Sequence, residues 1–181
     1  GSPDGSFGAG GVTTIPIGAW PDSAHDVAIQ PDGKIVAAGY HSSAGDYQIA
    51  VVRVGETGSP DNSFDGDGIR TLNVSAGSDS LESLLIEPGG SILAAGASDI
   101  SGSSGILVLR LTATGGLDPS MNGTGTFVTQ LGDTSSQAKT VLRQPDGRIV
   151  VAARAVVNGQ MFEFALTRLE ANGDLDAGFG G

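Results

Sequence analysis

The chain lacks several features that often identify a function. It has no cysteine, which excludes a disulfide framework and a thiolate zinc site. It has no apolar run of about 18 residues, so we expect no helical membrane insertion. Lys and Arg number only 9 against 20 Asp and Glu, for a net charge of −11. Because phosphate groups are bound by basic clusters, we expect neither nucleic acid nor an anionic membrane surface as a partner.

Aromatic residues are also scarce, while glycine is abundant. The chain contains 30 glycines but only six phenylalanines, two tyrosines and one tryptophan, a composition that suits short strands joined by tight turns rather than long helices. No signal peptide is recognisable at the start. Because the first residues already belong to the repeat described next, we interpret the chain as an excised piece or a mature domain.

One sequence pattern returns every 57 residues. Gln-Pro-Asp-Gly-Lys-Ile at residues 30–35 recurs as Glu-Pro-Gly-Gly-Ser-Ile at 87–92 and as Gln-Pro-Asp-Gly-Arg-Ile at 144–149. A second marker keeps nearly the same spacing, at residues 3–7, 60–64, 117–121 and 175–179. A fixed period of this length indicates one supersecondary unit in several copies, each of which buries its apolar faces against its neighbours.

Each unit reads as four short strands. In the first unit we expect strands at residues 27–30, 35–39, 47–54 and 69–74, with a tight turn at 31–33. Four antiparallel strands make a small sheet that is apolar on both faces, and such sheets stacked around an axis form a β-propeller. We therefore predict an all-β fold of three four-stranded propeller blades, with a β-sandwich and a β-solenoid as the alternatives.

The chain ends are out of phase with the units. We place the blades at about 19–75, 76–131 and 132–181, with a strand at 11–17 that completes the last blade. Three blades are too few for a ring, so we expect a homo-oligomer: a dimer with six blades or a trimer with nine. The remaining alternative is that the chain is a fragment of a longer array.

The repeat resembles the delta-60 repeat family of bacterial surface and secreted proteins. The resemblance rests on the Gln-Pro-Asp-Gly-Lys-Ile pattern, on the following Ala-Ala-Gly, and on Asp-Gly-Ser-Phe-Gly at residues 4–8. The second unit departs from the pattern at residues 87–91 and the third at Arg154. The resemblance covers essentially the whole chain. It implies a β-propeller-like module of large extracellular proteins, and it implies no catalytic activity.

An aromatic cluster distinguishes the first unit. Trp20, Tyr40, His41 and Tyr47 lie in or beside two loops that should share one rim of the propeller. Aromatic and polar side chains together can stack on sugar rings or hold a peptide. We interpret these four residues as a candidate ligand-binding site, and ordinary packing of the rim as the alternative.

Acidic residues suggest a second candidate site. Asp61, Asp65 and Asp67 alternate with glycine in the long loop and could bring oxygen ligands to a calcium ion. The alternative is a plain turn in which the carboxylates accept backbone hydrogen bonds.

An arginine ends the third strand of every unit. Arg53, Arg110 and Arg168 could hold an anion, but we favour a structural role. The expected partners are the loop carboxylates of Asp61, Asp118 and Asp176, or carbonyl oxygens of the loops.

These observations predict a non-catalytic binding or adhesion module that is secreted or displayed on a bacterial surface and recognises a glycan, peptide or surface polymer. The first alternative is an assembly element that multimerises a larger surface protein. The second is a glycan-cleaving enzyme that uses carboxylates such as Asp26 and Glu82. Because the third unit has Lys139 and Thr140 at those positions, we do not expect catalysis.

Overall fold

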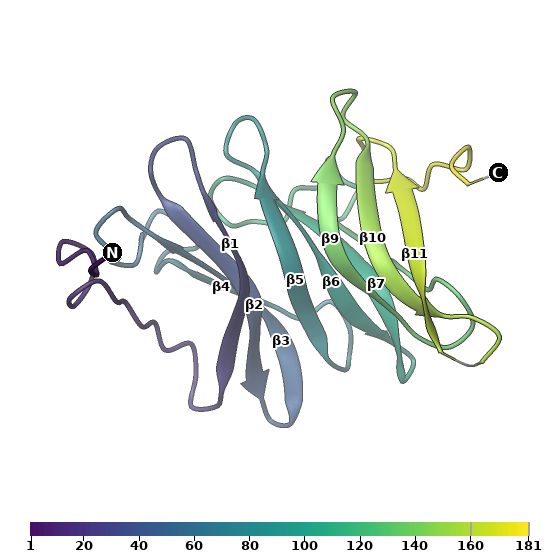
Figure 1. The fold of residues 1–181 in the computed structure, drawn as a ribbon, viewed down its shortest axis with the longest axis horizontal. Helices are drawn as coiled ribbons and strands as arrows, with labels where there is room; N and C mark the ends of the chain where they lie inside the picture. Colours follow the sequence, from purple (N-terminus) through teal and green to yellow (C-terminus); the bar gives the residue numbers. More distant parts are fainter. Residues whose placement is uncertain (160, 181) are drawn as a thin grey trace.

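The chain forms three antiparallel sheets that lie side by side in a row (Figure 1). A computed structural model describes residues 1–159 and 161–180, and these ranges contain no helix. The first sheet consists of β1 (Asp22–Ile29), β2 (Ile35–Ser43), β3 (Asp46–Val54) and β4 (Ile69–Leu72). The second consists of β5 (Asp79–Ile86), β6 (Ile92–Ile100), β7 (Ser103–Leu111) and β8 (Thr126–Thr129). The third has three strands, β9 (Ser136–Arg143), β10 (Ile149–Val156) and β11 (Phe162–Leu169).

The sheets are ordered as consecutive meanders. The strand orders are β1-β2-β3-β4, β5-β6-β7-β8 and β9-β10-β11. Three such sheets in sequence match three propeller blades, so the predicted all-β fold class is confirmed. Within the described ranges, no helix is long and apolar enough to cross a membrane.

The repeated Pro-Asp-Gly sequence, which is Pro-Gly-Gly in the second unit, makes the first hairpin turn of each sheet. Gly33, Gly90 and Gly147 adopt φ angles of 84°, 88° and 92°, which glycine reaches without the steric cost of a Cβ atom. In the first sheet the turn is closed by the backbone N–H of Gln30, which donates to the carbonyl oxygen of Lys34 over 2.7 Å. The repeated motif is therefore a turn that fixes the register of the two strands it joins.

The middle sheet is buried on both faces. Successive side chains of a strand point to opposite faces, so adjacent residues pack against different neighbouring sheets. Ala94 on β6 packs toward the first sheet, whereas the adjacent Leu93 packs toward the third. On β7, Leu107 faces the first sheet and Ile106 faces the third. All four side chains are fully buried. Removal of this apolar surface from water is the main force that holds the row of sheets together.

Loops that follow the third strands also tie neighbouring sheets together. Phe64 is fully buried, and its ring lies so close to Gly115 of the next unit that an added Cβ would be 3.1 Å from it. Met121 lies against Gly173 in the same way, because an added Cβ there would be 2.6 Å from the Met121 side chain. The second marker of the repeat thus supplies one apolar side chain that packs against the next unit: Phe64 in the first unit and Met121 in the second. We call this side chain the apolar plug.

The segment at 11–17 does not form the expected strand within a single chain. Among the residues that the structure describes, its one β contact is an isolated bridge between Gly8 and Val12. The segment lies beside the first sheet, at the opposite end of the row from the third sheet (Figure 1). Completion of the third blade by residues 11–17 stays a prediction that requires another chain.

We predict that Phe64→Ala destabilises the fold by about 3–5 kcal/mol, the usual cost of truncating a buried phenylalanine. Phe179 occupies the same place in the motif of the last unit but has no following sheet in the chain, so Phe179→Ala is the matched control and should have a much smaller effect. Thermal unfolding of both variants measures the difference. Equal losses would contradict the packing role of the plug.

Candidate functional site

The first strand of each sheet carries a β-bulge at the same repeat position. Pairing along β1 passes from Ala24 to Asp26 and leaves out His25. The same interruption leaves out Glu82 in β5 and Lys139 in β9. Bulges turn a side chain away from the regular alternation of a strand and are frequent beside functional sites.

The three bulged residues form a line of charged and polar groups across the sheets. The Glu82 Oε2 atom lies 3.7 Å from His25 Nδ1 and 3.5 Å from Lys139 Nζ. Gln137 Nε2 also donates a hydrogen bond of 2.8 Å to Glu82 Oε1, while His25 Nδ1 lies 2.9 Å from the carbonyl oxygen of Leu81. Glu82 is therefore the centre of a polar cluster that draws on all three sheets.

Three residues of this cluster, His25, Glu82 and Gln137, line a groove of about 300 Å³. Tyr40 is the central aromatic residue, with its ring centroid 4.4 Å from that of Tyr47 and 5.4 Å from that of His25. The Tyr40 and Tyr47 rings are tilted by 45°, and those of His25 and Tyr40 meet edge to face at 75°. The other lining residues are Ser78, Ser80, Glu82, Ala97, Asp99, Ser104 and Gln137.

The groove therefore combines an aromatic wall with hydrogen-bonding side chains from three sheets. Tyr47 is 46% exposed, so its ring is open to a ligand. Carboxylates, an amide and hydroxyls provide both donors and acceptors. Such a surface suits a polar ligand with apolar ring faces better than it suits a wholly apolar ligand.

Two of the four predicted ligand-binding residues lie outside this groove. Trp20 is 63% exposed in the loop before β1 and does not line the groove. His41 is buried, and its Nε2 atom lies 3.0 Å from Gln48 Oε1. The structure thus brings Tyr40 and Tyr47 together, and gives His41 a packing position.

Sequence reasoning names Glu82 only as a candidate catalytic carboxylate and does not bring it together with His25 and Lys139. The signal for this cluster is the repeat itself: His25, Glu82 and Lys139 are spaced by 57 residues, so one polar position recurs on the first strand of every sheet. No local sequence motif predicts the bulges that turn these side chains toward one another.

The recurring arginines join consecutive sheets. Arg53 Nε lies 2.8 Å from Asp61 Oδ2, and Arg53 also donates to the carbonyl oxygen of Ala113 in the next unit. Arg168 Nε lies 2.7 Å from Asp176 Oδ2. These two ion pairs are the ones expected from the sequence.

Arg110 has a different partner. Its Nε atom lies 2.7 Å from Glu87 Oε2, and its Nη2 atom donates to the carbonyl oxygen of Ala171 over 3.2 Å. We expected Asp118 in this role. Glu87 replaces the glutamine of the other two units, and this buried carboxylate takes the guanidinium, while Asp118 Oδ1 accepts the backbone N–H of Ser120 over 3.0 Å.

The three proposed calcium ligands are engaged separately. Asp61 pairs with Arg53 and Lys34, Asp65 pairs with Arg70 at 3.2 Å, and Asp67 accepts the backbone N–H of Ile69. Among the described residues no group of three or more acidic or histidine side chains is placed to hold a metal ion. The three carboxylates thus make separate contacts in this structure, and a calcium site at this loop stays a prediction.

Asp26, one of the two carboxylates of the enzyme alternative, is committed to backbone hydrogen bonds. Its Oδ1 atom accepts from the N–H of Val27 and its Oδ2 atom from the N–H of Leu84, each over 2.8 Å. The second contact crosses to the next sheet, which makes Asp26 a link between blades.

A known family model matches the chain three times, once in each unit. The family model described as "Domain of unknown function (DUF5122) beta-propeller" matches residues 30–64, 88–120 and 144–179, which is more than half of the chain. The chain belongs to this family. Each match begins at the turn of a first hairpin and ends in the loop that carries the apolar plug, so each covers the second and third strands of one sheet. No curated protein matches the chain.

We predict that Arg110→Ala lowers the melting temperature by destabilising the fold by about 1.5–3 kcal/mol. The buried Glu87 carboxylate keeps only Arg143, whose Nε atom lies 3.0 Å from Glu87 Oε1, and the carbonyl oxygen of Ala171 loses its donor. The matched control is Arg70→Ala, which breaks the more exposed pair with Asp65 and should cost less than about 1 kcal/mol. Thermal unfolding of both variants tests the difference. An unchanged melting temperature in Arg110→Ala would reject the structural role.

A second prediction concerns acid stability. Burial raises the pKa of Asp61, but hydrogen bonds from Ser63 and Lys34 and the charge of Arg53 outweigh burial and hold this pKa well below its usual value. A carboxyl with a depressed pKa in the folded state stabilises the fold above its unfolded pKa of about 3.9, and this contribution is lost as the pH falls further.

We therefore expect Asp61→Asn to be less stable than the original chain at pH 7 and the gap to narrow below about pH 4. Chemical unfolding at a series of pH values measures both. A gap that stays constant down to pH 3 would contradict the role of the Asp61 charge.

Proposed function

We propose that this chain is a non-catalytic module that binds a neutral glycan in the groove between Tyr40, Tyr47 and the Glu82 cluster. The observation that carries the proposal is the meeting of two tyrosine rings with hydrogen-bonding side chains from all three sheets. A sugar ring has apolar faces bounded by hydroxyl groups, so it needs both kinds of surface at once. The lining of the groove includes both tyrosine rings and polar side chains.

The charges of the groove narrow the ligand class. Glu82 and Asp99 both line it, and the whole chain carries a net charge of −11. Long-range repulsion disfavours acidic polysaccharides. Hydroxyl groups can donate to the two carboxylates and accept from Gln137, so a neutral oligosaccharide is the better match.

The rigid scaffold supports a binding role. Gln137 already donates to Glu82, and the N–H of Tyr47 donates to Ser78 Oγ of the next sheet over 3.2 Å. Side chains that are held before the ligand arrives lose little conformational entropy on binding. The resemblance to delta-60 repeats supports secretion or display on a bacterial surface, where a glycan-binding module would act in adhesion.

We predict that Tyr47→Ala weakens glycan binding at least tenfold, a loss of about 1.4 kcal/mol or more. Tyr47 is half exposed, so its truncation should not unfold the chain. The control is Trp20→Ala, which removes an exposed aromatic side chain outside the groove and should leave the affinity unchanged.

A panel of immobilised neutral glycans identifies the ligand, and titration calorimetry then compares the two variants. Failure to bind any glycan would reject the proposed function. Glycan binding that is lost in Trp20→Ala but retained in Tyr47→Ala would reject the site.

A further inference from the structure

The third sheet ends on β11, a strand with an open edge, whereas the corresponding strands of the other two sheets are each covered by a fourth strand. β3 pairs with β4, and β7 pairs with β8, whereas β11 has no such partner among the described residues. An uncovered edge presents a row of backbone donors and acceptors to another strand. The open edge of β11 therefore lies where the other two sheets hold their fourth strand.

The face of the third sheet beside this edge is apolar and exposed. Phe164 is 84% exposed and Leu166 is 50% exposed. Their counterparts in the first two units are fully buried against the following sheet: Ile49, Val51, Ile106 and Val108. The repeat pattern therefore places a further sheet against Phe164 and Leu166.

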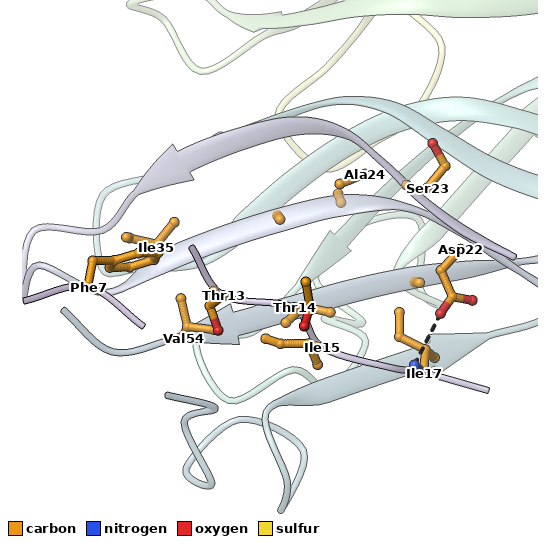
Figure 2. A pocket seen from close by; sticks show the side chains of 15 residues that line it. Phe7, Thr13, Thr14, Ile15, Ile17, Asp22, Ser23, Ala24, Ile35 and Val54 are labelled. Atoms are coloured by element: carbon orange, nitrogen blue, oxygen red, sulfur yellow. Dashed lines mark hydrogen bonds between the residues drawn. The ribbon is translucent and has the colours of Figure 1, made fainter. Parts of the chain in front are cut away.

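The missing fourth strand has a counterpart at the other end of the row. Residues 12–17 correspond to the fourth strands at a spacing of 57, and the crossover that follows them has the geometry of a crossover between blades. The N–H of Ile17 donates to Asp22 Oδ2 over 3.1 Å (Figure 2), as the N–H of Val74 donates to Asp79 Oδ2 over 2.8 Å.

The loop before this segment is docked in the same repeated manner. The N–H of Gly8 donates to the carbonyl oxygen of Thr57 over 2.8 Å, as that of Asp65 donates to Thr114 over 2.9 Å. Phe7 lies against Gly58, as Phe64 lies against Gly115. The segment is thus held beside the first sheet in the position of the outer strand of a preceding blade.

The described residues contain no first, second or third strand for that preceding blade. Ile15 and Ile17 line a cavity of about 450 Å³ against the outer part of the first sheet (Figure 2). Beyond the segment, the side chains of Val27 and Ile29 on β1 stay 61% and 70% exposed. This bare apolar surface has the position that three further strands would cover.

We propose that the third sheet of a second copy of this chain fills this place and takes residues 12–17 as its fourth strand. The register follows from the first two sheets, where Ala50 is opposite Thr71 and Leu107 is opposite Val128. It places Thr14 opposite Ala165 of the other copy. The contact is head to tail, so two copies can close a ring by making it twice.

The proposed pairing requires the loop at 3–11 of one copy to displace residues 175–180 of the other. Asp176 and Phe179 contact Arg168 in the way that Asp61 and Phe64 contact Arg53. In the assembled pair, Asp4 and Phe7 of the neighbouring copy would occupy the same place. Because the loop at 3–11 is continuous with the pairing strand, we infer that it displaces residues 175–180 and that Asp4 replaces Asp176 on Arg168.

The absence of native cysteine allows a direct test by disulfide formation. Thr14→Cys combined with Ala165→Cys places two thiols opposite each other across the proposed ladder. The matched control, Thr14→Cys with Leu166→Cys, moves one thiol to the opposite face of β11. Mild oxidation should give covalent dimers from the first variant and much less from the second. Absence of covalent species from the first variant, or equal yields from both, would overturn the proposed register.

Native mass measurement tests the association without added cysteines. We expect the full chain to be a dimer, Leu166→Glu to be a monomer, and Phe179→Ala to shift the equilibrium toward the dimer because it loosens the competing loop. Met161→Glu is the control, since Met161 is 80% exposed at the hairpin position where the first unit has Asp46. A monomeric full chain, or a dimer that Leu166→Glu leaves intact, would overturn the proposal. Neither result depends on glycan binding.

Discussion

The structure depends on the fact that each small sheet is apolar on both faces. A sheet of four short strands cannot shield two such faces by itself, so it is stable only between neighbours. The middle sheet meets this requirement on both sides, with Ala94 buried toward one neighbour and Leu93 toward the other. The end sheets meet it on one side only. Much of the remaining organisation serves the contact between consecutive sheets.

The polar links between sheets follow the same repeat as the apolar ones. Arg53 and Arg110 each join a loop carboxylate or a buried glutamate to a carbonyl of the next unit. Asp26 reaches the backbone of the second sheet. These contacts connect residues of consecutive sheets that lie far apart in the sequence. They also hold neighbouring sheets in a fixed relation, which a groove shared by three sheets requires.

The candidate site arises where the repeat is least regular. Bulges at His25, Glu82 and Lys139 place three different side chains at one equivalent position. Tyr40 and Tyr47 belong to the first unit alone. A scaffold of similar blades can thus carry an asymmetric binding surface without a change in its packing, because the variation is confined to bulges and strand ends.

The sequence by itself determined the period, the strand content, the Pro-Asp-Gly turns and the fold class. These follow from local propensities and from apolar patterning, which act over a few residues and recur at each copy. It also identified Tyr40 and Tyr47 as residues that stand out from the repeat. Tertiary structure decided that Tyr40 meets His25, that His41 is buried, and that Arg110 pairs with Glu87 rather than Asp118. Those outcomes depend on how neighbouring sheets are placed and on competition between partners far apart in the chain, and neither is encoded in any short stretch of residues.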